Sequence, residues 1–333
     1  MARALLGLGV VGQGLRELTL GHIFLSDEDV TGLGIEPPEV ANAVEAALIA
    51  KSEGRLHTTP KSSIMPGDGR YMMSTLAVGD DGLTVLKAVG VYPENAGRDL
   101  PAITGAIMVL DAETGRLRAV MDANWVTAVR TAALSVVAAR RMADPKAKSA
   151  AFVGCGVQAS SHLAAFNAMF PLEKIYVIGR GGANVDRLCG EARDMGLTAE
   201  QTTPDVALPL ADLIVTSITL DYSIKPFLDA NLLKPGAFAA VTDLFIPWKD
   251  TSATAFGGIV VDDLEQERAA EKPMVSADLI KDDLTGIVVN SEFSVPQDRP
   301  NAFIFRGLAL GDYAAAALAL KVAEKAGAGQ RIG

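Results

Sequence analysis

A glycine-rich loop between two short apolar runs has the residues needed to bind a dinucleotide. The loop, residues 154–159, reads GCGVQA and lies between the apolar runs 150–153 and 175–178. In a strand–loop–helix unit, Gly154 would allow the tight turn, and Gly156 would let backbone N–H groups approach a pyrophosphate at the positive end of the helix. Both flanking strands and a small third residue are present, so the loop predicts a dinucleotide site. The alternative is an ordinary glycine turn in a parallel sheet.

Two cations lie where charged side chains are unusual. Lys87 is part of the apolar stretch LTVLKAVGV, residues 83–91, and Arg130 is among small apolar residues in VTAVRTAAL, residues 126–134. A buried ammonium requires an anionic partner such as a substrate carboxylate, and a planar guanidinium suits a bidentate contact with a carboxylate or phosphate. Either residue could instead be a structurally paired cation or one that extends to solvent. Together they indicate an anionic substrate.

An acid follows a later apolar strand, where it could serve general acid–base chemistry. Asp243 comes directly after AFAAVT, residues 237–242. In a doubly wound sheet the carboxyl ends of the strands face the ligand crevice, so this carboxyl group could relay a proton beside a bound nicotinamide. An Asx-turn or a helix cap is the alternative. Taken alone, Lys61 after a proline and Arg306 in IFRGLAL have no assigned role.

The elements that would position these residues change character near residue 145. A Rossmann-type doubly wound parallel sheet is predicted from residue 149 onward, because apolar strands and helices alternate there. The stretch before it predicts a strand with a capped helix start at 24–30, a helix at 37–51, an antiparallel meander at 70–121 and an alanine-rich helix at 123–142. A closing helix is expected at 308–326, and residues 280–295 are ambiguous.

We therefore expect an α/β protein with two domains. The Rossmann domain would span residues 145–299, and an α+β domain for substrate binding and dimerisation would span 23–144 and be completed by the C-terminal helix region 300–333. Residues 1–22 would be an extension. They contain a more literal glycine fingerprint, GLGVVG at 7–12, but no full strand precedes it and no apolar strand follows, so no nucleotide is expected there.

Composition narrows the class of partner. The 333 residues are 49% hydrophobic, and 30 Lys and Arg against 40 Asp and Glu give a net charge of −10. Without a basic block or an apolar run of membrane-spanning length, neither nucleic acid nor a membrane is an expected partner. Two cysteines and three histidines form no metal-ligand pattern and no disulfide framework, so we expect no metal and a cytoplasmic protein.

Several of these motifs, taken in order, resemble the ornithine cyclodeaminase/mu-crystallin family. The resemblance covers residues 24–330 and rests on the lysine strand with a following Pro93-x-Asn95, the turn DAETG, Arg130-Thr131-Ala132-Ala133, the loop GxGxQA, and Asp243 before a Pro-Trp-Lys loop. Agreement of several motifs in order is more specific than any one of them. The resemblance implies binding of NAD(H) or NADP(H), chemistry at the Cα–N bond of amino acids or cyclic imines, and a homodimer.

The resemblance also implies roles for individual residues. Lys61, Lys87 and Arg130 match positions that hold the substrate carboxylate, although the family usually has an arginine at the first of them. Lys87 and Asp243 are the expected catalytic residues, the second as the acid/base group. Lys249 is the loosest match, because the loop after Asp243 is two residues longer. The expected cofactor contacts are Arg130, Gly154, Gly156, Val157, Gln158, Arg180, Thr216, Val241 and Lys249.

Three features bear on selectivity. The second strand ends at Gly179-Arg180 without an acid for a ribose hydroxyl, which tilts the prediction slightly toward NADP. The stretch 70–78 has no acid to meet the distal ammonium of ornithine. Arg306 stands where the resemblance leads us to expect a small apolar residue in cyclodeaminases, and a cation there would favour a second carboxylate.

The expected activity is NAD(P)H-dependent reduction of a small α-imino acid to the L-amino acid. A dicarboxylic imine such as iminosuccinate, which would give L-aspartate, is one such substrate. Cyclodeamination of ornithine or lysine with bound NAD, an alanine-type dehydrogenase and a crystallin-like binding protein are the alternatives.

Overall fold

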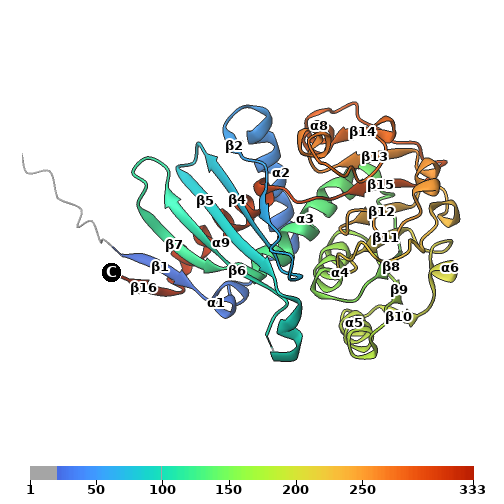
Figure 1. Ribbon diagram of the computed structural model, residues 1–333, viewed down its shortest axis with the longest axis horizontal. Helices are drawn as coiled ribbons and strands as arrows, with labels where there is room; N and C mark the ends of the chain where they lie inside the picture. The colour runs from blue at the N-terminus through green and yellow to red at the C-terminus, as the bar shows by residue number, and fades with distance from the viewer. Residues whose placement is uncertain (1–20, 99) are drawn as a thin grey trace, which may run out of the picture.

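The computed structural model describes residues 21–98 and 100–333. These residues form two eight-stranded sheets, which lie at the left and the right of Figure 1. The glycine pattern at 7–12 and nearly all of the expected extension lie outside the described residues. Residue 22, which was expected to close that extension, instead begins strand β1. No helix in the described part of the chain is both long and apolar enough to cross a bilayer.

The first sheet confirms the predicted meander. Four long antiparallel strands form its centre, and β1 joins them in parallel beside β7. The C-terminal strand pairs with β1, so both ends of the described chain meet in this sheet. In spatial order the strands are β16 (Gln330–Ile332), β1 (His22–Leu25), β7 (Leu117–Asp122), β6 (Ile103–Asp111), β5 (Leu83–Val91), β4 (Tyr71–Gly79) and β2 (Leu56–Thr58), with β3 (Ser62–Ile64) also paired to β4.

In the described ranges, the helices that pack on this sheet cover the face turned away from the viewer in Figure 1 and leave the other face open. The short helix α1 (Asp27–Thr31) begins with the expected cap, in which Ser26 and Asp29 exchange hydrogen bonds. The alanine-rich helix α3 is buried on most of its sides because its small side chains allow close approach of its neighbours. The covering helices are α2 (Pro37–Ser52), α3 (Asn124–Met142) and α9 (Ala309–Ala326).

The second sheet confirms the doubly wound prediction, because every neighbouring pair of strands in it is parallel. Its central strands are buried on both faces, as expected for short apolar runs between two helical layers. The spatial order is β10 (Thr198–Gln201), β9 (Lys174–Ile178), β8 (Ser149–Val153), β11 (Leu213–Thr216), β12 (Phe238–Val241), β15 (Asn301–Ile304), β13 (Gly258–Val261) and β14 (Ile280–Asp283). The helices are α4 (Val157–Met169), α5 (Gly182–Asp194), α6 (Pro204–Ala207), α7 (Leu264–Arg268) and α8 (Leu284–Val289).

The boundary expected at residue 300 is wrong for the strand that follows it. β15 lies inside the second sheet, between β12 and β13, and only α9 and β16 return to the first sheet. The short run NAFI does not indicate which strands it pairs with, because a continuous apolar run shows that a strand is buried but carries no information about its neighbours in the sheet. The ambiguous stretch after residue 280 contains β14 and α8.

Candidate functional site

The site is organised by the register of the second sheet, which aligns the carboxyl ends of its strands in one row. Val153 pairs with Ile178 on one side and with Thr216 on the other, and the row continues through Val241 to Ile304. The first two residues after each of these five therefore emerge along one edge of the sheet. They include Gly154 of the predicted dinucleotide loop, Asp243 and Arg306.

The glycine loop has the shape that its predicted role requires. Gly154 has φ +93°, and a Cβ added there would lie 2.6 Å from the carbonyl oxygen of Ser217. Gly156 is the N-cap of α4, and a Cβ added there would meet no protein atom within 4 Å. Gly154 is thus needed by the fold, whereas Gly156 leaves open space in front of the helix N-terminus, where a pyrophosphate would fit.

This contrast predicts different outcomes for two similar substitutions. Gly156→Ala is expected to leave the thermal unfolding temperature unchanged and to weaken dinucleotide binding, because its methyl group enters only the open space. Gly154→Ala is expected to lower the unfolding temperature as well, since the backbone and Ser217 both oppose a side chain there. Thermal unfolding and fluorescence titration with NADH measure both. Wild-type NADH affinity in Gly156→Ala would show that the loop does not hold the cofactor.

Asp243 is fully buried and is held by groups at the end of the neighbouring strand β11 and just after it. The Thr216 hydroxyl donates to Oδ1 at 2.9 Å, and the Ile218 N–H donates to Oδ2 at 3.1 Å. These contacts exclude the alternative that the carboxylate caps a following helix. Burial raises the pKa of Asp243 to about 7, although both hydrogen bonds oppose the rise. A carboxyl group with a pKa near neutrality can both give and accept a proton.

The turn after Asp243 is strained and is fixed by aromatic packing. Leu244 and Phe245 have φ of 58° and 65°, and no other non-glycine residue in the described ranges has a positive φ. Bulky side chains rarely adopt this conformation unless their surroundings impose it. Phe245 stacks on Trp248 with ring centroids 5.9 Å apart, and the indole N–H of Trp248 donates to the Thr216 hydroxyl. This packing fixes the direction in which Asp243 leaves β12.

Lys87 is buried as predicted, but its anionic partner comes from within the chain. Its Nζ lies 2.6 Å from Oδ1 of Asp312 on α9, and both side chains are almost completely buried. Of the two partners that the sequence left open, a substrate carboxylate and a structural one, the described structure supplies the structural one. Burial lowers the pKa of Lys87 to about 8, and Asp312 acts against that fall. Sequence reasoning missed Asp312, although a single acid in the alanine-rich stretch 309–320 was a usable signal.

Arg130 leaves part of its guanidinium group unused. Nε lies 3.2 Å from the same oxygen of Asp312, and the group lies over the ring of Phe305, 4.9 Å from its centroid. Nε and Nη1 are buried and have no hydrogen-bond partner. Lys61 lies close enough for its charge to lower the pKa of Lys87. Lys87 and Arg130 thus share one internal carboxylate, with the charge of Lys61 nearby, so this cluster suits a further anion.

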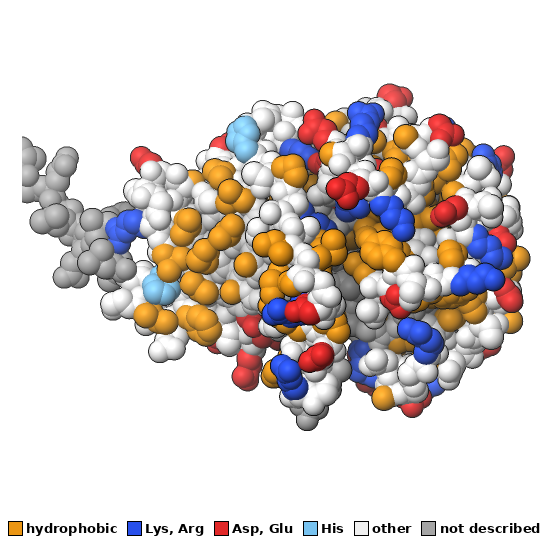
Figure 2. All heavy atoms as spheres, viewed as in Figure 1, with side chains coloured by type: hydrophobic (Ala, Val, Ile, Leu, Met, Phe, Trp, Pro, Cys, Tyr) orange, Lys and Arg blue, Asp and Glu red, His pale blue; other side chains and the backbone are white. Residues whose placement is uncertain are grey.

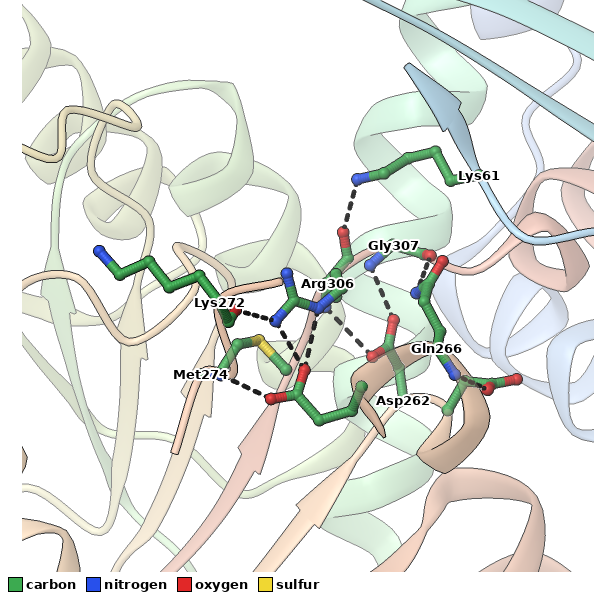
Figure 3. A network of polar contacts seen from close by, with 9 residues as sticks. Lys61, Asp262, Gln266, Lys272, Met274, Arg306 and Gly307 are labelled. Atoms are coloured by element: carbon green, nitrogen blue, oxygen red, sulfur yellow. Dashed lines mark hydrogen bonds and ion pairs between the residues drawn. The ribbon is translucent and has the colours of Figure 1, made fainter. Parts of the chain in front are cut away.

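Arg306 is paired rather than free (Figure 3). Its Nε and Nη2 donate to the buried Glu267 at 2.9 and 2.7 Å, and Nη2 also donates to the carbonyl oxygen of Lys272. Its charge is therefore partly neutralised, which corrects the picture of an uncompensated cation. Nη1 makes no hydrogen bond or ion pair within the described part of the chain, so one edge of the fixed guanidinium remains for another anion.

The backbone beside Arg306 connects the two halves of the molecule. Asp262 accepts hydrogen bonds from the N–H groups of Arg306 and Gly307, and Lys61 of the first domain donates to the Arg306 carbonyl oxygen at 3.1 Å (Figure 3). The structure thus brings Lys61 to the edge of the second sheet. Asp262 and Glu267 were not singled out from the sequence, although Asp262 follows the strand GIVV just as Asp243 follows its own strand.

The remaining predicted cofactor residues differ in their surroundings. Gln158 is near the cations, because its Nε2 donates to the carbonyl oxygen of Thr127 on α3, while its Oε1 is buried and has no partner. Val157 and Arg180 are exposed, and Val241 is completely buried. Lys249 instead pairs at the surface with Asp229, so no contact draws it toward the glycine loop.

The chain is similar to known proteins along most of its length. The model of the ornithine cyclodeaminase/mu-crystallin family matches residues 21–243. The alanine dehydrogenase of Archaeoglobus fulgidus is 27% identical over 93% of this chain and 98% of its own. The iminosuccinate reductase of Paracoccus denitrificans is 25% identical over 93% and 99%. The solved dimer of an archaeal alanine dehydrogenase with bound NAD superimposes with a TM-score of 0.84 at 24% identity, over 94% of this chain and 99% of that one, and it shows the shared fold.

Proposed function

The chain belongs to the ornithine cyclodeaminase/mu-crystallin family, and we propose that it is an NAD(P)H-dependent reductase that converts a small α-imino acid to the L-amino acid. The observation that carries this proposal is a pair of complementary groups beside the glycine loop. One is the cluster of Lys61, Lys87 and Arg130 with unused guanidinium N–H groups, and the other is the buried carboxyl group of Asp243. The first suits a substrate carboxylate and the second suits a proton transfer.

Each part of the site has a distinct task in this reaction. Backbone N–H groups at the start of α4 would hold the pyrophosphate of the cofactor, and the reduced nicotinamide of that cofactor would supply the hydride. Lys61, Lys87 and Arg130 orient the substrate carboxylate, which fixes the position of the imine carbon. Asp243 in its protonated form keeps the imine nitrogen cationic, which makes the neighbouring carbon a better hydride acceptor.

A panel of 2-oxo acids with ammonium or methylamine tests the activity. Each mixture is offered with NADH and with NADPH, and the loss of reduced-cofactor absorbance is followed. We expect imine-dependent oxidation of the cofactor. Ammonia release from ornithine or lysine without net cofactor oxidation would instead establish cyclodeamination, and saturable binding without turnover would establish a binding protein. The two cofactors also test Arg180, which lies exposed at the end of β9 and could meet a 2′-phosphate.

For the substrate we propose a dicarboxylic imine such as iminosuccinate. Arg306 supports this choice, because Glu267 and the Lys272 carbonyl fix its guanidinium and leave Nη1 for a second carboxylate. The strand β4 carries no acid that could meet a distal ammonium group. An alanine-type dehydrogenase would have no use for this second cation.

Replacement of Arg306 is expected to change substrate preference. In Arg306→Leu, kcat/KM with oxaloacetate and ammonium should fall about 10-fold or more relative to kcat/KM with pyruvate and ammonium, because one charge-assisted hydrogen bond is lost. The double variant Arg306→Leu/Glu267→Gln is the control, since it avoids leaving a buried carboxylate without its partner. Equal losses for both substrates in the double variant would assign Arg306 a purely structural role.

We propose a homodimer that forms through the open face of the first sheet. A row of paired apolar residues crosses this face: Leu76, Leu86, Met108, Val120 and Phe24. Leu76, Met108 and Phe24 are exposed, and the other two are partly exposed. Figure 2 shows apolar side chains gathered over this part of the molecule. The sequence drew attention to the strand edges of the meander, whereas the structure offers a larger surface on its face. Exposed apolar rows of this kind are typical of protein interfaces.

A further inference from the structure

One buried carboxylate contacts two of the three cations to which the proposed function gives the task of binding the substrate carboxylate. Oδ1 of Asp312 contacts Lys87 Nζ at 2.6 Å and Arg130 Nε at 3.2 Å, while Oδ2 accepts a hydrogen bond from Thr75 at 2.9 Å. We infer that Asp312 is a positioning residue that acts through Lys87: it keeps Lys87 charged and in place to bind the substrate carboxylate. This inference rests on the proposed function.

The surroundings of Lys87 make this carboxylate necessary. Lys87 is 1% exposed, and an ammonium group without an anionic neighbour would lose its proton at such a depth. The other charged groups that face it are Arg130 of α3 and Lys61 before β3, and both repel it. Thr127 of α3 offers only a neutral hydroxyl at 3.5 Å. Asp312 is thus the one anion that contacts Lys87 in the described ranges.

Asp312 also leaves the cluster able to bind an anion. It contacts Arg130 only through Nε, and Nη1 stays without a partner. Lys87 and Arg130 hold the pKa of Asp312 low against the opposing effect of burial, so it is ionised at neutral pH. Because Lys87 and Arg130 share this single carboxylate, the three groups together keep a positive charge that a substrate carboxylate would compensate.

The test follows carboxylate binding rather than turnover and is made in an Asp243→Asn background, which removes the buried carboxyl group whose pKa is about 7. Burial also raises the pKa of Asp262, to about 6, so this second carboxyl group is already ionised where Lys87 loses its proton. Pyruvate is titrated onto the NADH complex across a range of pH by calorimetry. In Asp243→Asn the affinity should fall as the pH rises through about 8, where Lys87 loses its proton. In Asp243→Asn/Asp312→Asn that fall should occur about one pH unit or more lower, because desolvation and Arg130 act on Lys87 unopposed. Asp312→Glu in the same background should restore the original pH dependence.

Two further variants keep the inference falsifiable. Thr75→Val removes a hydrogen bond to Asp312 without changing any charge, so it should leave the pH dependence of pyruvate binding unaltered.

If the Asp312→Asn protein does not fold, Lys87→Arg serves instead. A guanidinium keeps its proton, so the fall near pH 8 should vanish, and persistence of that fall would overturn the inference. Weaker binding by the same factor at every pH in the Asp312→Asn protein would also overturn it. Because binding of pyruvate requires no reaction, a wild-type protein that reduces no imine would refute the proposed function and leave this result readable.

Discussion

Turnover is expected to fall about 10²-fold or more in Asp243→Asn, while the affinity for NADH stays unchanged. The amide keeps the shape of the carboxyl group and can still bond to Thr216 and Ile218, but it cannot donate an acidic proton to the imine nitrogen. Steady-state turnover with the best imine and a fluorescence titration with NADH measure the two effects. Near-normal turnover would refute the assignment of Asp243 as the acid.

The pH dependence of this step gives the same residue a second signature. Burial raises the pKa of Asp243 to about 7, so its proton is present below that pH and is lost as the pH rises through it. Wild-type turnover in the reductive direction should therefore fall above about pH 7, and the residual turnover of Asp243→Asn should not show this fall. Thr216→Val is a useful comparison, because its hydroxyl stabilises the carboxylate form. Loss of this hydroxyl should move the fall in turnover to higher pH rather than abolish it.

Lys87→Met is expected to damage catalysis and folding together. The substitution removes a charge-assisted contact to the substrate, so KM should rise and kcat should fall. It also leaves Asp312 buried with only Arg130 as a cationic partner, which should lower the free energy of unfolding by about 3–5 kcal/mol. Kinetics with the best imine and denaturant unfolding measure the two losses.

A double variant separates these losses. Lys87→Met/Asp312→Asn removes both charges of the buried pair but leaves Arg130 without its carboxylate, so it should recover only part of the stability and none of the activity. Wild-type kinetics at saturating substrate in either protein would show that Lys87 has only a structural role.

The sequence by itself determined the elements whose signals are local. The alternation of strands and helices after residue 149 gives the parallel sheet, and the spacing of Gly154 and Gly156 marks the turn that begins α4. The capped helix after β1, the meander and the alanine-rich α3 were likewise readable. Such patterns are visible because burial on one or both faces imposes a period on nearby residues.

Only the tertiary structure decided which distant groups meet, because contacts between remote segments leave no periodic trace in either of them. Lys87 and Asp312 are 225 positions apart, yet they form the pair on which the cation cluster depends. The insertion of β15 beside β12 places Arg306 near Asp243, and Glu267 turns an apparently free cation into a fixed one. In each case the desolvation of a charge had to be offset by a partner, and the chain supplied that partner from a segment that sequence spacing could not connect to it.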